Sequence, residues 1–385
     1  MTQLAVGLQG KGFDVEAFTS QPTYQGQLIK KLPNKENYKG VRINRLNSSQ
    51  FNKEKGIFRI INWITFTFLV MVHILRKSKR SDILLILSNP PILPFVGLFF
   101  KVVRNQRFIP VIHDIYPDIA VALGTVKKNS SIVKLWQAGN RILFRNADKI
   151  IVLGEKMKQE IIENSKGKIE PAKIKVIHNW EDPEFIKPVD KQKNPFSIKN
   201  GYDKQLTLLY SGNLGLHHDL MTIVKAAEKV KSLPVKFVFI GDGARKRKLQ
   251  DYIKEKKLKN VDFHPYQPLE KLPETLTCAD VSIISEDSRV NGLCVSCKIY
   301  SSLASGRAIL GLVSEDSDIG DIIEKSKCGF RINQGDSDKF AECIKFCLKN
   351  PEELEKMGVR SRKAFEENFT FDTALQQYIT TLKTP

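Results

Sequence analysis

The stretch Asn291–Ile309, NGLCVSCKIYSSLASGRAI, predicts a loop that leads directly into a helix. The apolar run Val281–Ile284 before it is typical of a strand, and apolar residues then recur at helical spacing until Gly306 ends the helix. The N-terminus of a helix carries unpaired N–H groups and a partial positive charge. With Gly292 to allow close approach of the backbone and Lys298 in the first turn, the loop predicts a pocket for a phosphate group. The alternative is that Lys298 is a solvated surface charge.

The same order of strand, turn and helix recurs along most of the chain. In the first half the predicted strands are Ile83–Leu87, Phe108–Ile112 and Lys149–Leu153. In the second half, Leu206–Gly215 and Val235–Gly243 each run from an apolar strand into a glycine turn. Strands that alternate with helices are typical of parallel sheets, whose ligands bind at the carboxyl ends of the strands. The glycine turns and the loop described above therefore share one sheet edge, which predicts a nucleotide site.

Polar residues also follow the strand Phe108–Ile112, in the order HDIYPD. His113, Asp114 and Asp118 lie where the carboxyl end of a parallel strand places groups that contact a ligand. His113 and Asp114 are therefore candidate catalytic residues. The alternative is that Asp114 caps the next helix and that its neighbours are solvated.

The chain is long enough for two domains and is strongly basic. At 385 residues it exceeds what one hydrophobic core usually supports, and the segment His178–Lys204, rich in proline and charge, is typical of an interdomain linker. A net charge of +19 indicates an anionic partner, which could be nucleic acid, an acidic membrane surface or a phosphorylated substrate. The lysines are scattered rather than gathered on one element with aromatic residues, which argues against nucleic acid.

The six cysteines all lie in the C-terminal third. Cys294 and Cys297 have the C-x-x-C spacing of a redox pair or half a zinc site, but the sequence holds no second pair and no His and Cys cluster to complete a metal shell. We therefore expect no metal and no cofactor. Cys343 and Cys347 fit a helical pattern as small core residues, and a reducing, cytoplasmic compartment is expected.

The segment Gly56–Arg80 is long and apolar. Arg59, Asn62 and His73 interrupt it, so it predicts a buried or interfacial helix rather than a membrane span. The basic run RKSKR at its end would attract anionic lipid and give reversible attachment to a membrane. The aromatic residues expected to contact that membrane are Trp63, Phe66 and Phe68.

A succession of motifs covers nearly the whole chain in order. The motifs are GFDVEAFTSQP, NPP, HDIYPD, ADKIIVLGEKMKQEI, IKVIHNWEDPEFIKP, YSGNLG, FVFIGDG, VDFHPYQPLEKLPE, CKIYSSLASGRAIL and FTFDTALQQYITTL. This succession resembles the bacterial retaining glycosyltransferases of family four, closest to the branch that builds exopolysaccharide, O-antigen and colanic acid. The resemblance implies an α/β glycosyltransferase-B fold, with two Rossmann-like domains that face each other across a cleft. An acceptor-side domain would comprise residues 1–185 and 370–385, and a nucleotide-sugar domain residues 186–369.

The resemblance also implies roles for individual residues. Gly212 and Asn213 would lie by the donor diphosphate and Lys298 would pair with it, while His113 or Asp114 would touch the donor sugar or the acceptor hydroxyl. Asp242, with Tyr266 and Gln267, would face the nucleotide base. The predicted donor-binding residues are Gly212, Asn213, Gly215, Asp242, Tyr266, Gln267, Gly292, Leu293, Lys298 and Ser301. The family often has two glutamates where this chain has Leu293 and Ser301, so the ligand of the ribose hydroxyls is open.

The function implied is transfer of a hexose, with retention and without a metal, from a nucleotide sugar to a polyprenyl-diphosphate-linked saccharide at the inner face of the cell membrane. Two alternatives are a nucleotide-sugar epimerase on the same fold and an inactive homologue that only binds nucleotide sugar. Relatives begin with a strand and a glycine loop before the helix that opens here at Thr2. We therefore expect an N-terminal sheet that lacks its first strand, in a chain whose Met1 is internal to a longer protein or whose gene is truncated.

Overall fold

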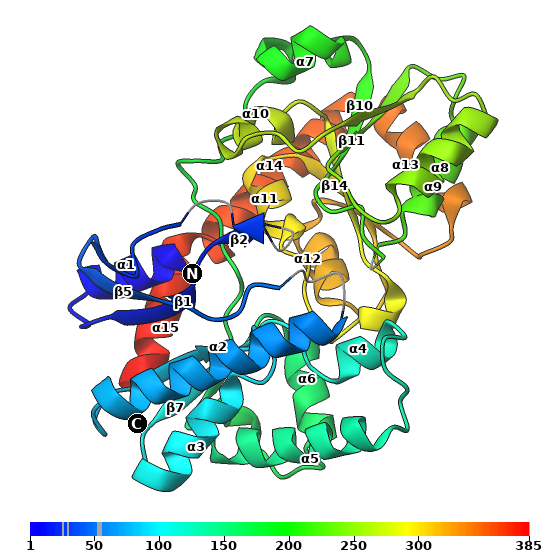
Figure 1. The fold of residues 1–385 in the computed structure, drawn as a ribbon. Helices are drawn as coiled ribbons and strands as arrows, with labels where there is room; N and C mark the ends of the chain where they lie inside the picture. Colours follow the sequence, from blue (N-terminus) through cyan, green and yellow to red (C-terminus); the bar gives the residue numbers. More distant parts are fainter. Residues whose placement is uncertain (25–26, 29–30, 52–55, 217, 385) are drawn as a thin grey trace.

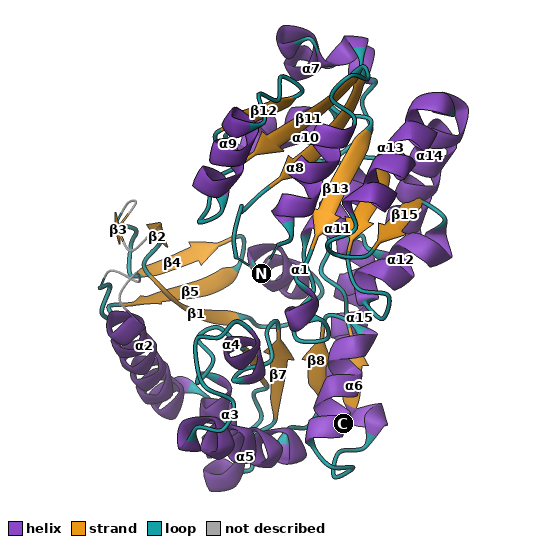
Figure 2. Cartoon of the chain, turned by 90° about the vertical axis from the view of Figure 1, so that its right-hand side faces the viewer, coloured by secondary structure: helices purple, strands orange, loops and turns teal. Residues whose placement is uncertain are grey.

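The computed structural model describes residues 1–24, 27–28, 31–51, 56–216 and 218–384. The chain forms two α/β domains, one above the other in Figure 1, each built on a parallel sheet. Buried apolar runs form the strands. Amphipathic helices alternate with these strands along the chain and cover the sheets (Figure 2).

The C-terminal domain contains one six-stranded sheet, in the order β12-β11-β10-β13-β14-β15. Every described ladder in it is parallel. Its strands are β10 (Leu206–Ser211), β11 (Val235–Ile240), β12 (Val261–His264), β13 (Val281–Ser285), β14 (Ala308–Leu312) and β15 (Gly329–Ile332). The chain runs outward from β10 to β12 and then returns to β13 on the other side of β10. This reversal of strand order is where α/β sheets bind ligands.

Helices enclose this sheet on both sides. They are α8 (Leu220–Lys229), α9 (Lys246–Glu255), η4 (Leu269–Lys271), α10 (Leu272–Leu276), η5 (Ser288–Val290), α11 (Lys298–Ala304), α12 (Asp318–Ser326), α13 (Ser337–Lys349) and α14 (Pro351–Asn368). Four of them begin at a side chain that accepts a backbone N–H of the first turn: Asp219 for α8, Asp287 for η5, Ser317 for α12 and Asp336 for α13.

The N-terminal domain divides its strands between separate sheets. A four-stranded parallel sheet has the order β6-β7-β8-β9, and a three-stranded sheet has the order β1-β5-β4. The strands are β1 (Glu16–Ser20), β2 (Thr23–Tyr24), β3 (Gln27–Leu28), β4 (Lys35–Tyr38), β5 (Val41–Leu46), β6 (Leu84–Leu87), β7 (Phe108–Ile112), β8 (Ile150–Val152) and β9 (Ile174–Val176). Within the described part of the chain no ladder joins β1 to β6, so these two sheets are separate.

The helices of this domain are α1 (Thr2–Gly10), α2 (Gly56–Lys77), α3 (Pro94–Arg104), α4 (Asp118–Ala122), α5 (Ser131–Asn146), α6 (Glu155–Asn164) and η1 (Pro171–Lys173). The last helix, α15 (Phe371–Lys383), returns to this domain, because Leu375 and Tyr378 are buried in one cluster with Leu4 and Leu8 of α1. This return follows the path that the resemblance implied. The residue boundaries given above for the two domains stay a prediction.

The linker is more regular than predicted. Within His178–Lys204 the chain forms η2 (Lys191–Lys193), α7 (Pro195–Asn200) and η3 (Tyr202–Lys204). The Asn194 side chain accepts the N–H groups of Phe196 and Ser197, which satisfies the first turn of α7. Asn followed by Pro is itself a helix-start signal, which explains a short helix within this segment.

Helix α2 is the one helix of the described residues that is long and apolar enough to cross a membrane, with 22 residues and a mean hydropathy of 1.8 over its most apolar window. The core helix of a soluble protein can meet the same criterion. One side of α2 packs on the domain, because Val70 and Ile74 are buried in a cluster with Phe100 of α3.

Candidate active site

Two glycine turns at the carboxyl ends of β10 and β11 are packed so closely that no side chain fits. Gly212 has φ +128° and Gly241 has φ +144°, which L-residues rarely adopt. A Cβ at Gly241 would lie 2.0 Å from the Gly212 carbonyl oxygen, and one at Gly212 would lie 2.7 Å from Cε of Lys298. The structure therefore brings the turn of β10 and the predicted phosphate-binding lysine together.

Asn213 and Asp242 continue these turns side by side. The Leu214 N–H donates to the Asp242 carbonyl oxygen at 2.8 Å, and the Tyr210 hydroxyl donates to the Asn213 carbonyl oxygen at 2.9 Å. Both backbone segments are thus fixed while the Asn213 and Asp242 side chains are exposed. A Cβ at Gly215 would lie 2.8 Å from the Asn213 amide nitrogen, so this glycine also leaves room for the turn.

Lys298 is the first residue of α11 and is half-buried. Its Nζ lies 3.2 Å from Nε2 of His218 and 5.4 Å from the centre of the Tyr210 ring. Burial lowers the pKa of Lys298, and the negative charge of Glu286 opposes that effect. A desolvated cation beside these closely packed turns suits an anion such as a diphosphate.

His218 positions this lysine. Its Nδ1 lies 2.5 Å from the Ser285 carbonyl oxygen, which can only accept, so we assign the ring proton to Nδ1 and the acceptor role to Nε2. The Ser285 hydroxyl also accepts from the Asp219 N–H at 2.8 Å. The imidazole is therefore held with its acceptor nitrogen toward Lys298.

Glu286 is a further residue of this site that the sequence analysis did not identify. It follows β13 directly, is 8% exposed, and its Oε1 accepts the Ser296 N–H at 2.7 Å. Burial raises the pKa of Glu286 to about 7, against the opposing effects of the Ser296 hydrogen bond and Lys298. The strand-end position that indicated Asp114 also applies to Glu286, and was the signal available in the sequence.

On the N-terminal side, His113 and Asp114 follow β7 as predicted. The His113 N–H donates to Oγ of Ser88 at 2.9 Å, and burial lowers the pKa of its ring. Among the described residues the buried Nε2 of His113 has no hydrogen-bond partner. The alternative role for Asp114 was wrong, because α4 begins four residues later and Pro117 precedes it.

The two domains meet at these residues. Asp114 pairs with Cys294 in an isolated antiparallel bridge, and the Ile115 N–H donates to the Leu293 carbonyl oxygen at 2.9 Å. The residue after β7 therefore lies against the loop that precedes Lys298. The resemblance implied that these two segments would contact one donor, and the fold brings their backbones together.

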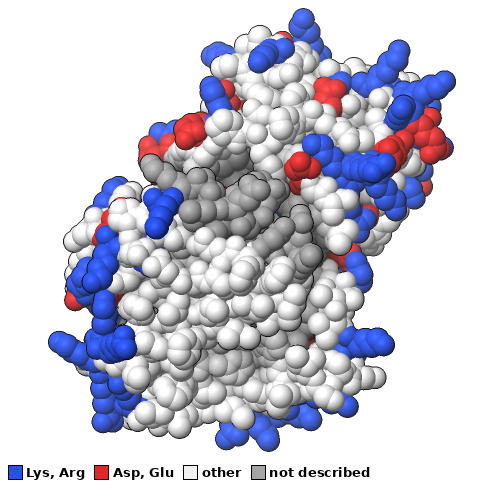
Figure 3. All heavy atoms as spheres, viewed as in Figure 1, with Lys and Arg blue, Asp and Glu red and all other residues white. Residues whose placement is uncertain are grey.

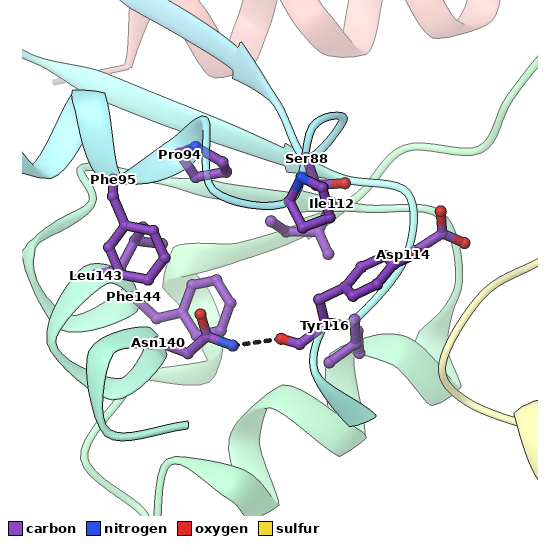
Figure 4. Close-up of a pocket in the computed structure, with 11 residues that line it drawn as sticks. Ser88, Pro94, Phe95, Ile112, Asp114, Tyr116, Asn140, Leu143 and Phe144 are labelled. Carbon is purple, nitrogen blue, oxygen red and sulfur yellow. Dashed lines mark hydrogen bonds between the residues drawn. The ribbon is translucent and has the colours of Figure 1, made fainter. Parts of the chain in front are cut away.

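A small pocket lies beside Asp114 (Figure 4). Its walls come from the segment before α3, the segment after β7 and the inner side of α5. Asn140 of α5 donates to the Tyr116 carbonyl oxygen at 2.6 Å across the pocket (Figure 4). The apolar lining residues are Pro91, Pro94, Phe95, Ile112, Ile115, Leu143 and Phe144.

The remaining predicted residues are placed differently. Leu293 is 7% exposed and packs in the core, so its side chain offers no contact to a ribose. A Cβ at Gly292 would lie 3.6 Å from the Lys156 carbonyl oxygen, at the contact between the domains. The Ser301 hydroxyl donates to the Lys298 carbonyl oxygen at 3.2 Å.

Tyr266 and Gln267 lie on the loop after β12. The exposed Tyr266 hydroxyl lies 3.5 Å from the Asp242 carbonyl oxygen, and the Gln267 amide donates to the Pro265 carbonyl oxygen at 2.9 Å. Tyr266 thus reaches the β11 turn, whereas the Gln267 side chain bonds within its own loop. Within the described ranges, no group of three or more His, Cys, Asp or Glu side chains could hold a metal ion.

Two family models match the chain. Residues 1–180 match the "Glycosyl transferase 4-like domain" and residues 191–364 match "Glycosyl transferases group 1". The probable glycosyltransferase WbjE of Pseudomonas aeruginosa is 24% identical over 328 residues, which is 85% of this chain and 80% of the relative. The putative colanic acid biosynthesis glycosyl transferase WcaI of Escherichia coli is 24% identical over 256 residues, covering 65% of this chain and 61% of WcaI.

Solved structures share the fold. Sucrose-phosphate synthase of Thermosynechococcus elongatus superposes with a TM-score of 0.78 at 16% identity, over 99% of this chain and 91% of that protein. HepE of Anabaena in complex with UDP superposes with a TM-score of 0.67 at 15% identity, over 89% of this chain and 85% of HepE. These likenesses identify the two-domain arrangement as the glycosyltransferase-B fold.

Proposed function

We propose, from the premise that the chain belongs to the group 1 glycosyl transferases, that it moves a hexose from a nucleotide sugar to a saccharide acceptor with retention of configuration. The product would enter a cell-surface polysaccharide. The observation that supports this proposal most is the convergence of half-buried Lys298 with the glycine turns of β10 and β11 at the point where the strand order reverses.

The charge of the leaving group explains why these residues would matter. When the bond from the anomeric carbon to the diphosphate breaks, its electron pair stays on the diphosphate oxygen. Lys298 stabilises this charge more in the transition state than in the bound donor. The acceptor hydroxyl then bonds to the anomeric carbon on the face that the diphosphate leaves, and the diphosphate takes its proton.

His113 and Asp114 would hold the sugar and the acceptor hydroxyl from the other domain. The bridge to Cys294 puts the backbone of Asp114 beside the donor loop, and among the described residues the buried Nε2 of His113 has no hydrogen-bond partner. We assign both residues to the reaction because their segment pairs with the loop that precedes Lys298.

The acceptor in this proposal is a saccharide linked to polyprenyl diphosphate, and the site of action is the cytoplasmic face of the cell membrane. The name of WcaI refers to colanic acid biosynthesis, and HepE was solved with UDP, a nucleoside diphosphate. Those names support a polysaccharide product and a nucleotide-sugar donor for this chain. We further propose that transfer needs no metal.

The test is to incubate the purified protein with a panel of nucleotide sugars and measure release of nucleoside diphosphate with and without lipid-linked acceptors. We expect acceptor-dependent release that persists in a chelator, and a product whose glycosidic linkage keeps the donor's anomeric configuration by NMR. Interconversion of the sugar without release would indicate the epimerase instead. Tight binding without turnover of any donor would indicate an inactive homologue.

A further inference from the structure

The side of α2 that faces away from the domain is a continuous apolar stripe. Ile57, Ile60, Ile64, Phe68 and Leu75 recur at the spacing of one helix side and are all exposed, with Phe68 at 57%. Trp63 and Phe66, which the sequence analysis expected to contact lipid, are only half-exposed. The exposed stripe is therefore aliphatic over most of its length.

Two further helices extend this surface. α2 packs against α3, and α3 packs against α5, where a Cβ at Gly139 would lie 3.0 Å from the Phe95 ring. Leu135 of α5 is 75% exposed and Val102 of α3 is 72% exposed, among the most exposed apolar side chains of the chain. The other exposed apolar residues of these two helices are Phe99, Val103, Ile132 and Ile142.

The charges of the three helices have one sign. Their sequences contain eight Lys and Arg residues and no Asp or Glu. The basic run continues beyond α2 with exposed Lys79 and Arg80. Figure 3 shows the surface over α2 as white, with Lys and Arg at its edge. An apolar area with a basic rim complements an anionic bilayer, which offers acyl chains beneath negative headgroups.

An aromatic row joins this surface to the candidate active site. The ring centres of Trp63 in α2 and Tyr116 lie 6.3 Å apart, and those of Tyr116 and Trp136 in α5 also lie 6.3 Å apart. Tyr116 lines the pocket beside Asp114 (Figure 4). Residues of α3 and α5, two of the helices that carry the apolar surface, line the same pocket.

We infer that the exposed sides of α2, α3 and α5 form one surface that docks on an anionic lipid bilayer and brings the pocket beside Asp114 to the lipid surface. Only one part of this inference rests on the proposed function, namely that a lipid-linked acceptor uses the pocket. α2 lies in the plane of the interface, because its inner side is packed through Val70 and Ile74 and cannot also face lipid. Insertion as a span would expose that cluster.

The test compares two exposed valines on helices of different domains. Val102 lies on α3 and is 72% exposed, and Val359 lies on α14 and is 65% exposed. We expect Val102→Asp, and Leu135→Asp on α5, to lower binding to vesicles of phosphatidylglycerol and phosphatidylcholine at least tenfold, and Val359→Asp to leave it unchanged. Binding of the unaltered chain should fall with added salt and on removal of the anionic lipid.

Equal vesicle binding by Val102→Asp and Val359→Asp would overturn the inference. The inference would also be wrong if salt and alkaline carbonate failed to release the bound protein, because α2 would then span the membrane. It would be wrong as well if the chain bound no vesicles and Val102→Asp dissociated a dimer, because the surface would then be an interface between copies. Turnover of the donor in solution is measured on the same variants. Vesicle binding without any turnover would support the membrane-docking surface and contradict the proposed function. Turnover without vesicle binding would support the proposed function and contradict the docking surface.

Discussion

Lys298 is the residue on which the proposed donor site most depends. We expect Lys298→Ala to lower kcat/KM for the donor about ten- to a hundredfold, because a charge-assisted contact to a diphosphate is lost. Lys229→Ala is the control, since Lys229 pairs with Asp338 on the surface of the same domain. Unchanged kinetics at low donor concentration would mean that Lys298 is only a surface charge.

Glu286 predicts a dependence of stability on pH. Its folded pKa is raised to about 7, so the folded state holds the proton more tightly than the unfolded chain. The associated stability is fully present below the pKa of the unfolded chain and is lost as pH rises through 7. Glu286→Gln cannot ionise and keeps an acceptor for the Ser296 N–H. We therefore expect the variant to gain roughly 1–3 kcal/mol over the unaltered protein between pH 5 and pH 8.

Urea unfolding at both pH values measures this difference. Lys298, which opposes the raised pKa, and Asp318, which adds to it, are present in both proteins. Burial also raises the pKa of Glu181 to about 7. Because Glu181 is present in both proteins, its effect on stability cancels in the comparison. A variant less stable than the parent at pH 8 would mean that attraction between Glu286 and Lys298 outweighs the desolvation of the carboxylate.

At the scale of elements, Arg362 of α14 fixes the linker to the C-terminal domain. Its guanidinium donates to the carbonyl oxygens of Ile186 at 2.7 Å, Ala304 at 2.8 Å and Pro183 at 3.3 Å. We expect Arg362→Ala to lower the free energy of unfolding by about 2–4 kcal/mol, since it leaves three acceptors without this partner. The neighbouring Lys363→Ala, which only loosens an exposed pair with Glu367, should change it by less than about 0.5 kcal/mol in the same urea titration.

Some elements and contacts could be predicted from the sequence, and others could not. Phe108–Ile112 was predicted to its ends because a buried parallel strand is a continuous apolar run between polar segments. The glycine turns at Gly212 and Gly241 could be predicted in the same way, because each comes at the end of an apolar strand. The bond of Ile115 to Leu293 could not be predicted, since it joins residues far apart in the chain whose side chains carry no signal for that pairing. The contact of His218 with Lys298 could not be predicted for the same reason.

At the scale of the whole molecule, a carboxylate of one domain lies at the start of a helix in the other. Oδ1 of Asp318 accepts the Lys156 N–H at 3.2 Å at the N-terminus of α6. A Cβ at Gly154 would lie 2.2 Å from Oδ2 of Asp318, so the carboxylate occupies the space that a side chain would need. The Lys156 ammonium also pairs with Asp316. A negative group at a helix N-terminus thus helps to hold the domains together.

This contact predicts that two variants act through one interaction. Asp318→Ala removes the carboxylate and Gly154→Ala displaces it, the latter without backbone strain because Gly154 is extended. Each should lower the free energy of opening between the domains by about 1 kcal/mol, which is about fivefold faster hydrogen exchange at the Ile115 amide. The double variant should exchange no faster than either single one, because both changes remove the same contact. Asp338→Ala, which breaks a pair within one domain, is the control. Additive effects of the two changes, or exchange at Ile115 that neither alters, would show that the contact between Asp318 and α6 does not hold the two sheet edges together.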